Sequence, residues 1–425
     1  MSRAARWAIL SSLSFAVAAW PAEITRVASS FEDNKPFGMF FDIAFDRVQE
    51  KGRIDREWHD DLAGGLRDVS ELRYQLVDTR LKFDAHIGLY QNLELHIGVP
   101  IVFQQDRSWT FSKGTDESNT TLYRNCQSPS GGGCASPGQG TGHLFEVGDS
   151  SASFRSGLGN LTFGLAWAPF VQAKDDTKPT WVVAFDYTAP TAAQLNPSVP
   201  TTGASRGAIG DRVHRYQFST SISKRIKIAE PYFQLHYTLP YVGPGAYSNC
   251  DDASATRLSH PENCGQGPWV RAETGIHPQH VGGFVFGSEI TAFEKLAAHQ
   301  KVAFDLRGWV TYTSQGRVEN ELSDMLGKLL QTGDFMELGG QIGFTGQAAE
   351  FIALKAFASL GYRTEHSLTG ELVGQDLDGT GVVDLTKNPL EVNPNFDFRV
   401  DRPGARFRIA EQYVFRFQVA ATFSF

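Results

Sequence analysis

Four side chains in one short part of the chain are of types that bind metal ions or exchange protons: Asp84, His86, Glu94 and His96. They lie in two alternating segments joined by a three-residue turn. A turn centred on Gln91 places His86 opposite His96 and the two carboxylates on the diagonals, about 5 to 7 Å away. The pattern fits a metal or pH-sensing site. It also fits a hydrogen-bonded network with no further role, which is the simpler interpretation.

A second set of potential ligands lies in the segment DLDGTGVVD near the end of the chain. Its oxygen donors, Asp376, Asp378, Thr380 and Asp384, have the spacing of a calcium-binding loop, with glycine at the sharp-turn position. The final ligand position holds Lys387 in place of a bidentate glutamate. The sequence predicts either weak calcium binding or an acidic surface turn, and no other cofactor.

The four cysteines fall into two local pairs, Cys126 with Cys134 and Cys250 with Cys264. The first residues place two arginines before an apolar run and a set of small residues, which predicts a signal peptide over 1–22, cleaved near 18–22. An even number of cysteines behind such a signal favours disulfides. Three pairings are possible, and closeness in sequence favours the two local ones. A thiolate metal site would need Cys-x-x-Cys spacing, which neither pair has.

Twelve segments of residues 23–425 alternate polar and apolar side chains with the period of a β-strand. The connections between these segments alternate between short turns and long stretches of some 20 to 50 residues. An even strand number with loops sorted by length predicts an all-β fold, a single antiparallel transmembrane β-barrel with short periplasmic turns and long extracellular loops. The predicted strands are 37–47, 77–89, 92–104, 158–168, 180–190, 212–223, 231–240, 281–292, 301–312, 335–346, 350–362 and 411–425.

The two faces of these strands predict two different surroundings. One face is apolar and is expected to meet lipid, with Trp and Tyr side chains, Trp309 among them, near the strand ends at the headgroup level. The other face is polar and of mixed charge, which a water-filled bore tolerates and a dry core does not. The residues expected to line the bore are Arg80, Lys82, Asp84, His86, Glu94, His96, Asp186, Arg215, His236, Glu289, Asp305, Arg307, Lys355 and Arg416.

The last strand ends on Phe425, and an aromatic terminal residue after a long alternating strand resembles the closing strand of bacterial outer-membrane barrels. Through this strand we expect recognition by the barrel-assembly machinery. No later segment has the run of about 20 apolar residues that a membrane helix needs, so only a closed barrel could span a bilayer. The net charge is −8 with no basic run, which argues against a nucleic-acid partner.

One long connection, 317–333, has apolar residues at a helical period. This predicts a short amphipathic helix in an extracellular loop. It could cover the mouth, enter the bore or rest on the rim.

Three phrases resemble a known family: HIGLYQNLELHIGVPIVF (86–103), GLGNLTFGLAWAPF (157–170) and WVVAFDYTAPT (181–191). They are similar to the hairpins of outer-membrane proteins grouped with the meta pathway of phenol degradation, regarded as transporters of aromatic or other hydrophobic compounds. The resemblance covers 77–191. The chain departs from the family's Gly-Asp and Pro-Thr-Gly at Asn160 and Ala192.

These observations predict a passive outer-membrane channel or uptake protein for small solutes, with hydrophobic or aromatic compounds implied by the resemblance. Its partners would be outer-membrane lipid and the solute. The alternative is a non-conducting barrel whose extracellular loops bind a partner or surface ligand. The one Gly-x-Ser-x-Gly match, GASRG at 203–207, falls in a predicted long loop and not between a strand and a helix. No zinc-protease pair or phosphate-binding loop is present, so we expect no enzyme. A lipase or protease with its catalytic group at the rim is the third hypothesis.

Overall fold

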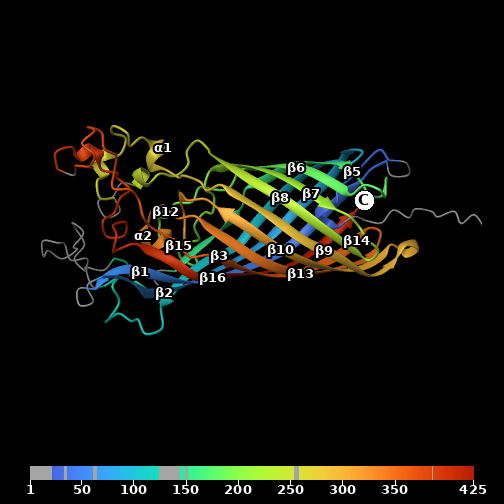
Figure 1. Ribbon diagram of the computed structural model, residues 1–425, viewed down its shortest axis with the longest axis horizontal. Helices are drawn as coiled ribbons and strands as arrows, with labels where there is room; N and C mark the ends of the chain where they lie inside the picture. The colour runs from blue at the N-terminus through green and yellow to red at the C-terminus, as the bar shows by residue number, and fades with distance from the viewer. Residues whose placement is uncertain are drawn as a thin grey trace, which may run out of the picture.

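The computed structural model describes residues 22–32, 36–60, 65–123, 144–148, 152–252, 258–384 and 386–425. Twelve antiparallel strands form a closed barrel, because the first strand of the wall pairs with both the second and the last. Loops gather at one end of the barrel and tight turns at the other (Figure 1). The wall consists of β1 Met39–Asp60, β2 Gly65–Tyr90, β3 Leu93–Phe111, β5 Leu161–Phe170, β6 Thr180–Ala189, β7 Val213–Ser223, β8 Ala229–Val242, β9 Val281–Lys295, β10 Gln300–Thr313, β13 Phe335–Ala349, β14 Ile352–Arg363 and β16 Phe407–Ser424. The predicted fold is confirmed.

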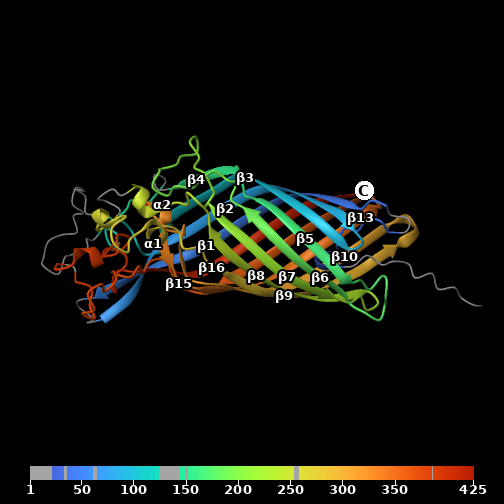
Figure 2. The same cartoon turned by 90° about the horizontal axis from the view of Figure 1, so that it is seen from above.

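The other elements are short and lie mostly at the loop end (Figure 2). Strand β4 pairs with β3 above β5, and β15 pairs with β16. Strands β11 and β12 form a separate hairpin. No helix among the described residues is long and apolar enough to cross a membrane. The short elements are η1 Glu23–Thr25, β4 Ser153–Leu158, η3 Asn249–Asp252, η4 Pro261–Asn263, α1 Arg271–Thr274, η5 Leu296–Ala298, β11 Gly316–Val318, α2 Ser323–Leu326, β12 Leu330–Thr332, β15 His366–Ser367 and η6 Pro389–Glu391.

Large apolar side chains cover the outside of the wall. Phe163, Phe233, Leu306 and Phe417, from four different strands, are all exposed. A closed barrel with an apolar outer band and a polar interior is the architecture of transmembrane barrels. The protein is therefore an outer-membrane β-barrel. The prediction for Trp309, at the headgroup level of the membrane, is wrong. Its side chain points into the barrel, where its Nε1 lies 3.2 Å from Glu337 Oε1.

The first hairpin is much longer than its sequence indicated. Residues 48–76 were predicted to be largely a loop, but β1 continues to Asp60 and β2 begins at Gly65, with a register shift at Ile54. Above the membrane a strand needs no apolar face, so this part of the hairpin does not show the alternation that marks the other strands. The predicted loop is replaced by a rigid extension of the wall.

The predicted amphipathic helix at 317–333 is also wrong. Only one helical turn, α2, forms there, and it lies between the strands of the β11–β12 hairpin. The turn ends at Gly327, whose φ of 67° is left-handed. Its apolar residues do not share one helix face: Leu322 and Leu330 join one buried cluster and Leu329 another.

Candidate functional site: a bore closed at both ends

Along one wall of the bore, basic side chains extend inward over buried acids. The side chain of Arg416 is 51% exposed and that of Lys82 is 32% exposed, whereas Asp46 between them is fully buried. Lys82 Nζ lies 2.9 Å from Asp46 Oδ2, and Arg416 Nε lies 3.6 Å from Asp46 Oδ1. Arg80 pairs in the same way with buried Asp78. This wall presents positive charge to the bore.

The facing wall carries a chain of polar contacts. Arg307 Nε donates to the Tyr232 hydroxyl at 3.0 Å, and that hydroxyl donates to Asp305 at 2.5 Å. Lys301 pairs with Glu289 on the neighbouring strand.

The remaining predicted residues of this wall lie on β7 and β8. Arg215 pairs with Asp211, and its side chain is 38% exposed. His236 lies opposite Ser219 in the register of β7 and β8.

The N-terminal segment, residues 22–32, crosses the turn end of the bore. Its backbone N–H groups donate to acidic side chains of the wall: Ala22 to Glu230 at 2.8 Å, and Ala28 to Glu94 at 2.5 Å. Glu23 Oε1 lies 2.6 Å from Lys355 Nζ on β14. These partners come from β3, β8 and β14, so the segment is held from several sides. Ala22 and Ala28 are buried, and the segment closes this end.

Gly88 on β2 makes room for this closure. A Cβ at Gly88 would lie 2.6 Å from Ser30 Oγ and 2.7 Å from the Ser29 carbonyl carbon. Ser29 Oγ accepts a hydrogen bond from the Asn92 N–H in the β2–β3 turn at 2.9 Å. The segment is thus fitted to the wall as well as bonded to it.

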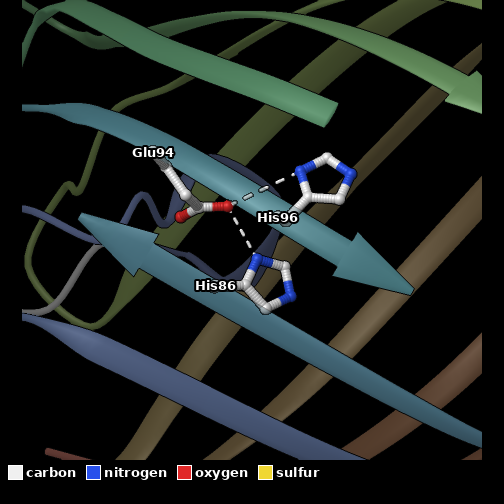
Figure 3. A group of neighbouring side chains, drawn as sticks. All are labelled: His86, Glu94 and His96. Carbon is white, nitrogen blue, oxygen red and sulfur yellow. Dashed lines mark hydrogen bonds and ion pairs between the residues drawn. The ribbon is translucent and has the colours of Figure 1, made fainter. Parts of the chain in front are cut away.

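Strands β2 and β3 pair His86 with His96, which confirms the predicted register. The turn itself is shorter than predicted, and a bulge at Leu89 restores the pairing. His86 Nδ1 lies 2.6 Å from Glu94 Oε1, and His96 Nδ1 lies 3.8 Å from the same oxygen (Figure 3). The two imidazole centroids are 5.4 Å apart.

The carboxylate that contacts the far side of His96 comes from another strand. His96 Nε2 lies 2.6 Å from Asp186 Oδ1 on β6. Gly164 on β5 stands between them in the ladder, and a Cβ there would lie 2.0 Å from the His96 ring. Asp84, expected at this position, leans over Gly98 instead, where an added Cβ would lie 2.6 Å from its Oδ1.

At the loop end, the segment 314–334 enters the barrel. Arg107 of β3 and Arg155 of β4 both pair with Asp324 of α2. Trp109 Nε1 donates to the Glu321 carbonyl at 2.9 Å. These contacts surround a cluster of buried apolar side chains from the wall and the loops: Ile54, Leu72, Tyr74, Trp109, Leu122, Phe145, Leu322, Leu330, Leu368, Val400, Phe407 and Ile409.

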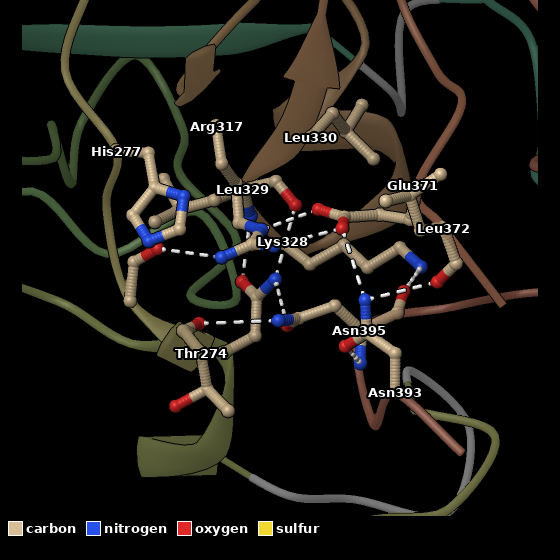
Figure 4. Close-up of polar contacts among 12 residues, drawn as sticks. Thr274, His277, Arg317, Lys328, Leu329, Leu330, Glu371, Leu372, Asn393 and Asn395 are labelled. Atoms are coloured by element: carbon tan, nitrogen blue, oxygen red, sulfur yellow. Dashed lines mark hydrogen bonds and ion pairs between the residues drawn. The ribbon is translucent and has the colours of Figure 1, made fainter. Parts of the chain in front are cut away.

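A second layer joins three loops, 243–280, 314–334 and 364–406 (Figure 4). Buried Arg317 pairs with buried Glu371, and its Nη1 donates to the Gly275 carbonyl at 3.0 Å. We call the three loops and this network the loop cap.

Amide side chains extend the same network. Asn249 Nδ2 donates to Asn395 Oδ1 at 2.8 Å and to the Leu329 carbonyl at 3.0 Å. Cys250, next to it, forms a disulfide with Cys264, which confirms that pairing. Cys126 and Cys134 lie outside the described residues.

Two neighbouring buried carboxyl groups in the loop cap have pKa values shifted in opposite directions. Burial alone would raise the pKa of Asp397, but Lys328 and Arg399 overcome this and hold it at about 2. Burial raises the pKa of Asp401 to about 6, although Lys328 and two backbone N–H groups oppose the shift. The loop cap therefore contains one acid that burial makes costly to ionise.

A cavity of about 210 Å³ lies against the loop cap. Its wall includes Glu50, Arg107, Glu319 and Arg363. Arg363 Nη1 lies 2.9 Å from Glu50 Oε2, so the cavity is polar and charged.

The predicted calcium ligands are only partly brought together. Carboxylate oxygens of Asp376 and Asp378 lie within 4.8 Å of each other and of Glu391. The hydroxyl of Thr380 donates to Val382, and Asp384 accepts from the Lys387 N–H. Glu391 comes from beyond the predicted loop. Calcium binding stays a prediction.

Sequence reasoning did not identify the N-terminal segment or its partners. The segment has no periodicity of its own. A usable signal was the presence of three acids, Glu94, Glu230 and Glu289, near the turn ends of separate strands. Because buried polar groups are hydrogen-bonded, acids gathered at one level of a bore indicate that another part of the chain supplies hydrogen-bond donors there.

No family model and no curated protein matches this chain. Among solved structures, an outer membrane channel from Pseudomonas putida F1 is similar with a TM-score of 0.43 and 10% identity, over 94% of this chain and 100% of that chain. A Pseudomonas aeruginosa FadL homologue has a TM-score of 0.36 and 12% identity, over 96% and 97%. The outer membrane protease OmpT from Escherichia coli has a TM-score of 0.31 and 6% identity, over 94% and 100%. These likenesses are too distant to carry an argument about function.

The sequence-based prediction that the protein is not an enzyme is wrong. One of the similar barrels is a protease.

Proposed function

We propose that the protein is a gated outer-membrane channel for the passive uptake of small solutes. The observation that carries the proposal is that the bore is polar and enclosed, while the closure at the turn end is bonded to the wall without being one of its strands. The N-terminal segment is attached by side chains and backbone N–H groups, and it is not one of the strands of the wall. A polar bore is suited to water and solutes, and a closure that is not part of the wall can leave without breaking the barrel.

The solutes that fit best are small aromatic or other hydrophobic compounds that carry a polar or anionic group. Support comes from the inward-facing guanidinium of Arg416 and from the aromatic rings of Tyr232 and Trp309 inside the bore. A guanidinium group binds carboxylates in a bidentate manner and stacks on aromatic rings. The family resemblance of residues 77–191 implies the same class.

The test is conductance in planar bilayers. The folded wild-type protein is compared with a variant that lacks residues 23–32. We expect small conductance steps from wild type and larger, more frequent openings from the variant. Aromatic carboxylates should reduce the ionic current as they occupy the bore.

Folding is checked by the heat-dependent shift in gel mobility typical of intact barrels. The matched control is Gly340→Ala, because an added Cβ at this lipid-facing position meets nothing closer than 3.7 Å. If neither the wild type nor the folded deletion variant conducts ions or permits liposome swelling, the channel proposal fails.

A second candidate function is binding by the last long loop, without conduction. Leu372 and Val382 are 78% and 65% exposed, and Phe398 is also exposed. A contiguous exposed apolar patch marks an interaction site, and these three side chains would supply one if they gather on the same face of the loop. Pull-down with intact cells, comparing wild type with a triple serine variant at these positions, separates the two functions.

A further inference from the structure

The cluster of His86, Glu94 and His96 has the donors of a transition-metal site. One ligand atom from each side chain lies within 4.8 Å of the other two. Both imidazole Nδ1 atoms face the same carboxylate oxygen, at 2.6 Å for His86 and 3.8 Å for His96 (Figure 3). Two adjacent strands therefore direct two nitrogens and an oxygen toward one point at the bore side of the wall.

In the neutral form of His96, no hydrogen lies between its Nδ1 and the Glu94 carboxylate. Nε2 of His96 lies 2.6 Å from Asp186 Oδ1, and a ring nitrogen this close to a carboxylate oxygen favours the tautomer with the hydrogen on Nε2. In the neutral ring, Nδ1 then presents a lone pair toward Glu94, which is also an acceptor. Two acceptors that face each other at 3.8 Å repel unless a cation or a proton lies between them.

We propose that His86, Glu94 and His96 bind one divalent transition-metal ion of the zinc class. Zinc takes imidazole nitrogens and carboxylate oxygens at about 2.0 to 2.2 Å, so its ligand atoms lie roughly 3.4 Å apart in tetrahedral geometry. To reach that spacing, Glu94 Oε1 must move roughly 0.8 Å away from His86 Nδ1 and roughly 0.4 Å closer to His96 Nδ1. Calcium and magnesium prefer oxygen donors alone. Three protein ligands leave the fourth position to water from the bore.

The surroundings resemble the outer shell of a metal centre. Asp186 faces the distal nitrogen of His96, and Asp42 Oδ2 lies 3.7 Å from the distal nitrogen of His86. Asp42 is shared with Lys355 and Arg26, at 3.6 Å and 3.9 Å. Metal-bound histidines characteristically donate their second N–H to a carboxylate, which fixes the ring and raises its basicity. Gly164 leaves the space for this arrangement.

Metal at this point would also act on the N-terminal segment. Glu94 Oε2 accepts the Ala28 N–H, while Oε1 faces the two histidines. A metal ion on Oε1 fixes the carboxylate and so holds the segment in the bore. This consequence for gating depends on the proposed channel function, whereas the metal site itself does not.

The experiment titrates the folded, EDTA-stripped protein with Zn²⁺ by calorimetry and with Co²⁺ by visible absorption. We expect one ion per chain and the strong visible bands of tetrahedral cobalt. His86→Ala and His96→Ala should each weaken zinc binding by roughly 100-fold or more, and Asp186→Asn by roughly 10-fold. His236→Ala is the control, because this bore histidine lies on β8, outside the cluster.

A double variant, His86→Ala with His96→Ala, that is folded by gel mobility and binds zinc as tightly as wild type would overturn the proposal. So would a cobalt spectrum that these substitutions leave unchanged. In bilayers, zinc should lengthen the closed periods of wild type and not those of His96→Ala. If zinc binds at this cluster but no form of the protein conducts, the metal site stands and the channel function falls.

Discussion

The two closures of the bore are built from different interactions. The N-terminal segment is held by hydrogen bonds and ion pairs to the wall, and Val27 alone of its side chains joins an apolar cluster. The loop cap shares an apolar core with the upper part of the wall, and it has buried ion pairs such as Arg317 with Glu371 and a disulfide. The N-terminal segment is an extended piece of chain bound to the inner wall, whereas the loop cap is a folded unit.

This difference indicates which closure moves. Each hydrogen bond from the N-terminal segment to a carboxylate contributes about 1.5 to 3 kcal/mol, because water replaces it on release. Opening the loop cap would expose an apolar core and uncompensated buried charges, which costs far more. On the proposed channel function, the closure at the turn end is the one that moves more readily, and the loop cap is the one that stays folded. The predictions below test this contrast.

The largest effect is expected from Arg317→Ala. The substitution leaves Glu371 buried without its partner, which costs about 3 to 5 kcal/mol. Hydrogen exchange in the loop cap should rise strongly, while the barrel keeps its heat-dependent gel mobility. Arg271→Ala is the control, since Arg271 and Asp251 form an exposed pair in the same loop region worth at most about 1 kcal/mol. Equal effects of the two substitutions would contradict a folded cap.

A smaller effect is expected from pH. The pKa of Asp401 is raised to about 6. Above pH 6 its carboxyl group is ionised, and the folded cap carries the full energetic cost of that buried charge. The cost disappears as the pH falls toward the usual pKa of an aspartate. Asp397, with its pKa lowered to about 2, stabilises the cap above its usual pKa and loses that contribution only in stronger acid. The free energy needed to open the loop cap, measured by hydrogen exchange, should therefore be about 2 kcal/mol higher at pH 4.5 than at pH 7. In Asp401→Asn the difference between the two pH values should largely vanish, whatever the absolute stability.

Gly88→Val should loosen the N-terminal segment by about 1 to 3 kcal/mol, because the added side chain meets Ser29 and Ser30. Amide exchange at Ala28 and Ser30 should quicken, with the loop cap unaffected. Gly340→Ala serves as the neutral comparison. Faster exchange throughout the loop cap in Gly88→Val would show that the two closures are coupled, against the contrast drawn here.

The wall strands could be predicted because lipid imposes a rule on every second residue. Phe83, Leu95 and Phe417 must be apolar outside, so each strand carries its own signal. The extended tips of β1 and β2 stand in water, where pairing of the backbone suffices and no alternation is required. The same reason hides the β11–β12 hairpin, whose apolar residues are divided between two clusters.

The candidate site shows the same division. The pairing of His86 with His96 follows from local hairpin geometry, so it could be predicted. The contact of His96 with Asp186 crosses β5 and depends on the missing side chain of Gly164, which a single sequence does not indicate. The acids that anchor the N-terminal segment were visible, but their donors are backbone N–H groups, which have no signature in the sequence.

The smallest effect concerns calcium in the last long loop. The glutamate missing from the predicted motif is supplied by Glu391, near Asp376 and Asp378. Backbone N–H groups of Gly381 and Gly379 already lower the pKa of Asp376, so the loop favours ionised carboxylates without an ion. Binding should be weak, and calcium at ten times its dissociation constant should stabilise the loop by about 1.4 kcal/mol. Calorimetric titration of the full protein is the measurement, with Glu391→Gln expected to remove the heat and Asp116→Asn, in another loop, to leave it. No heat at millimolar calcium would establish the segment as an acidic turn, closed by its own hydrogen bonds.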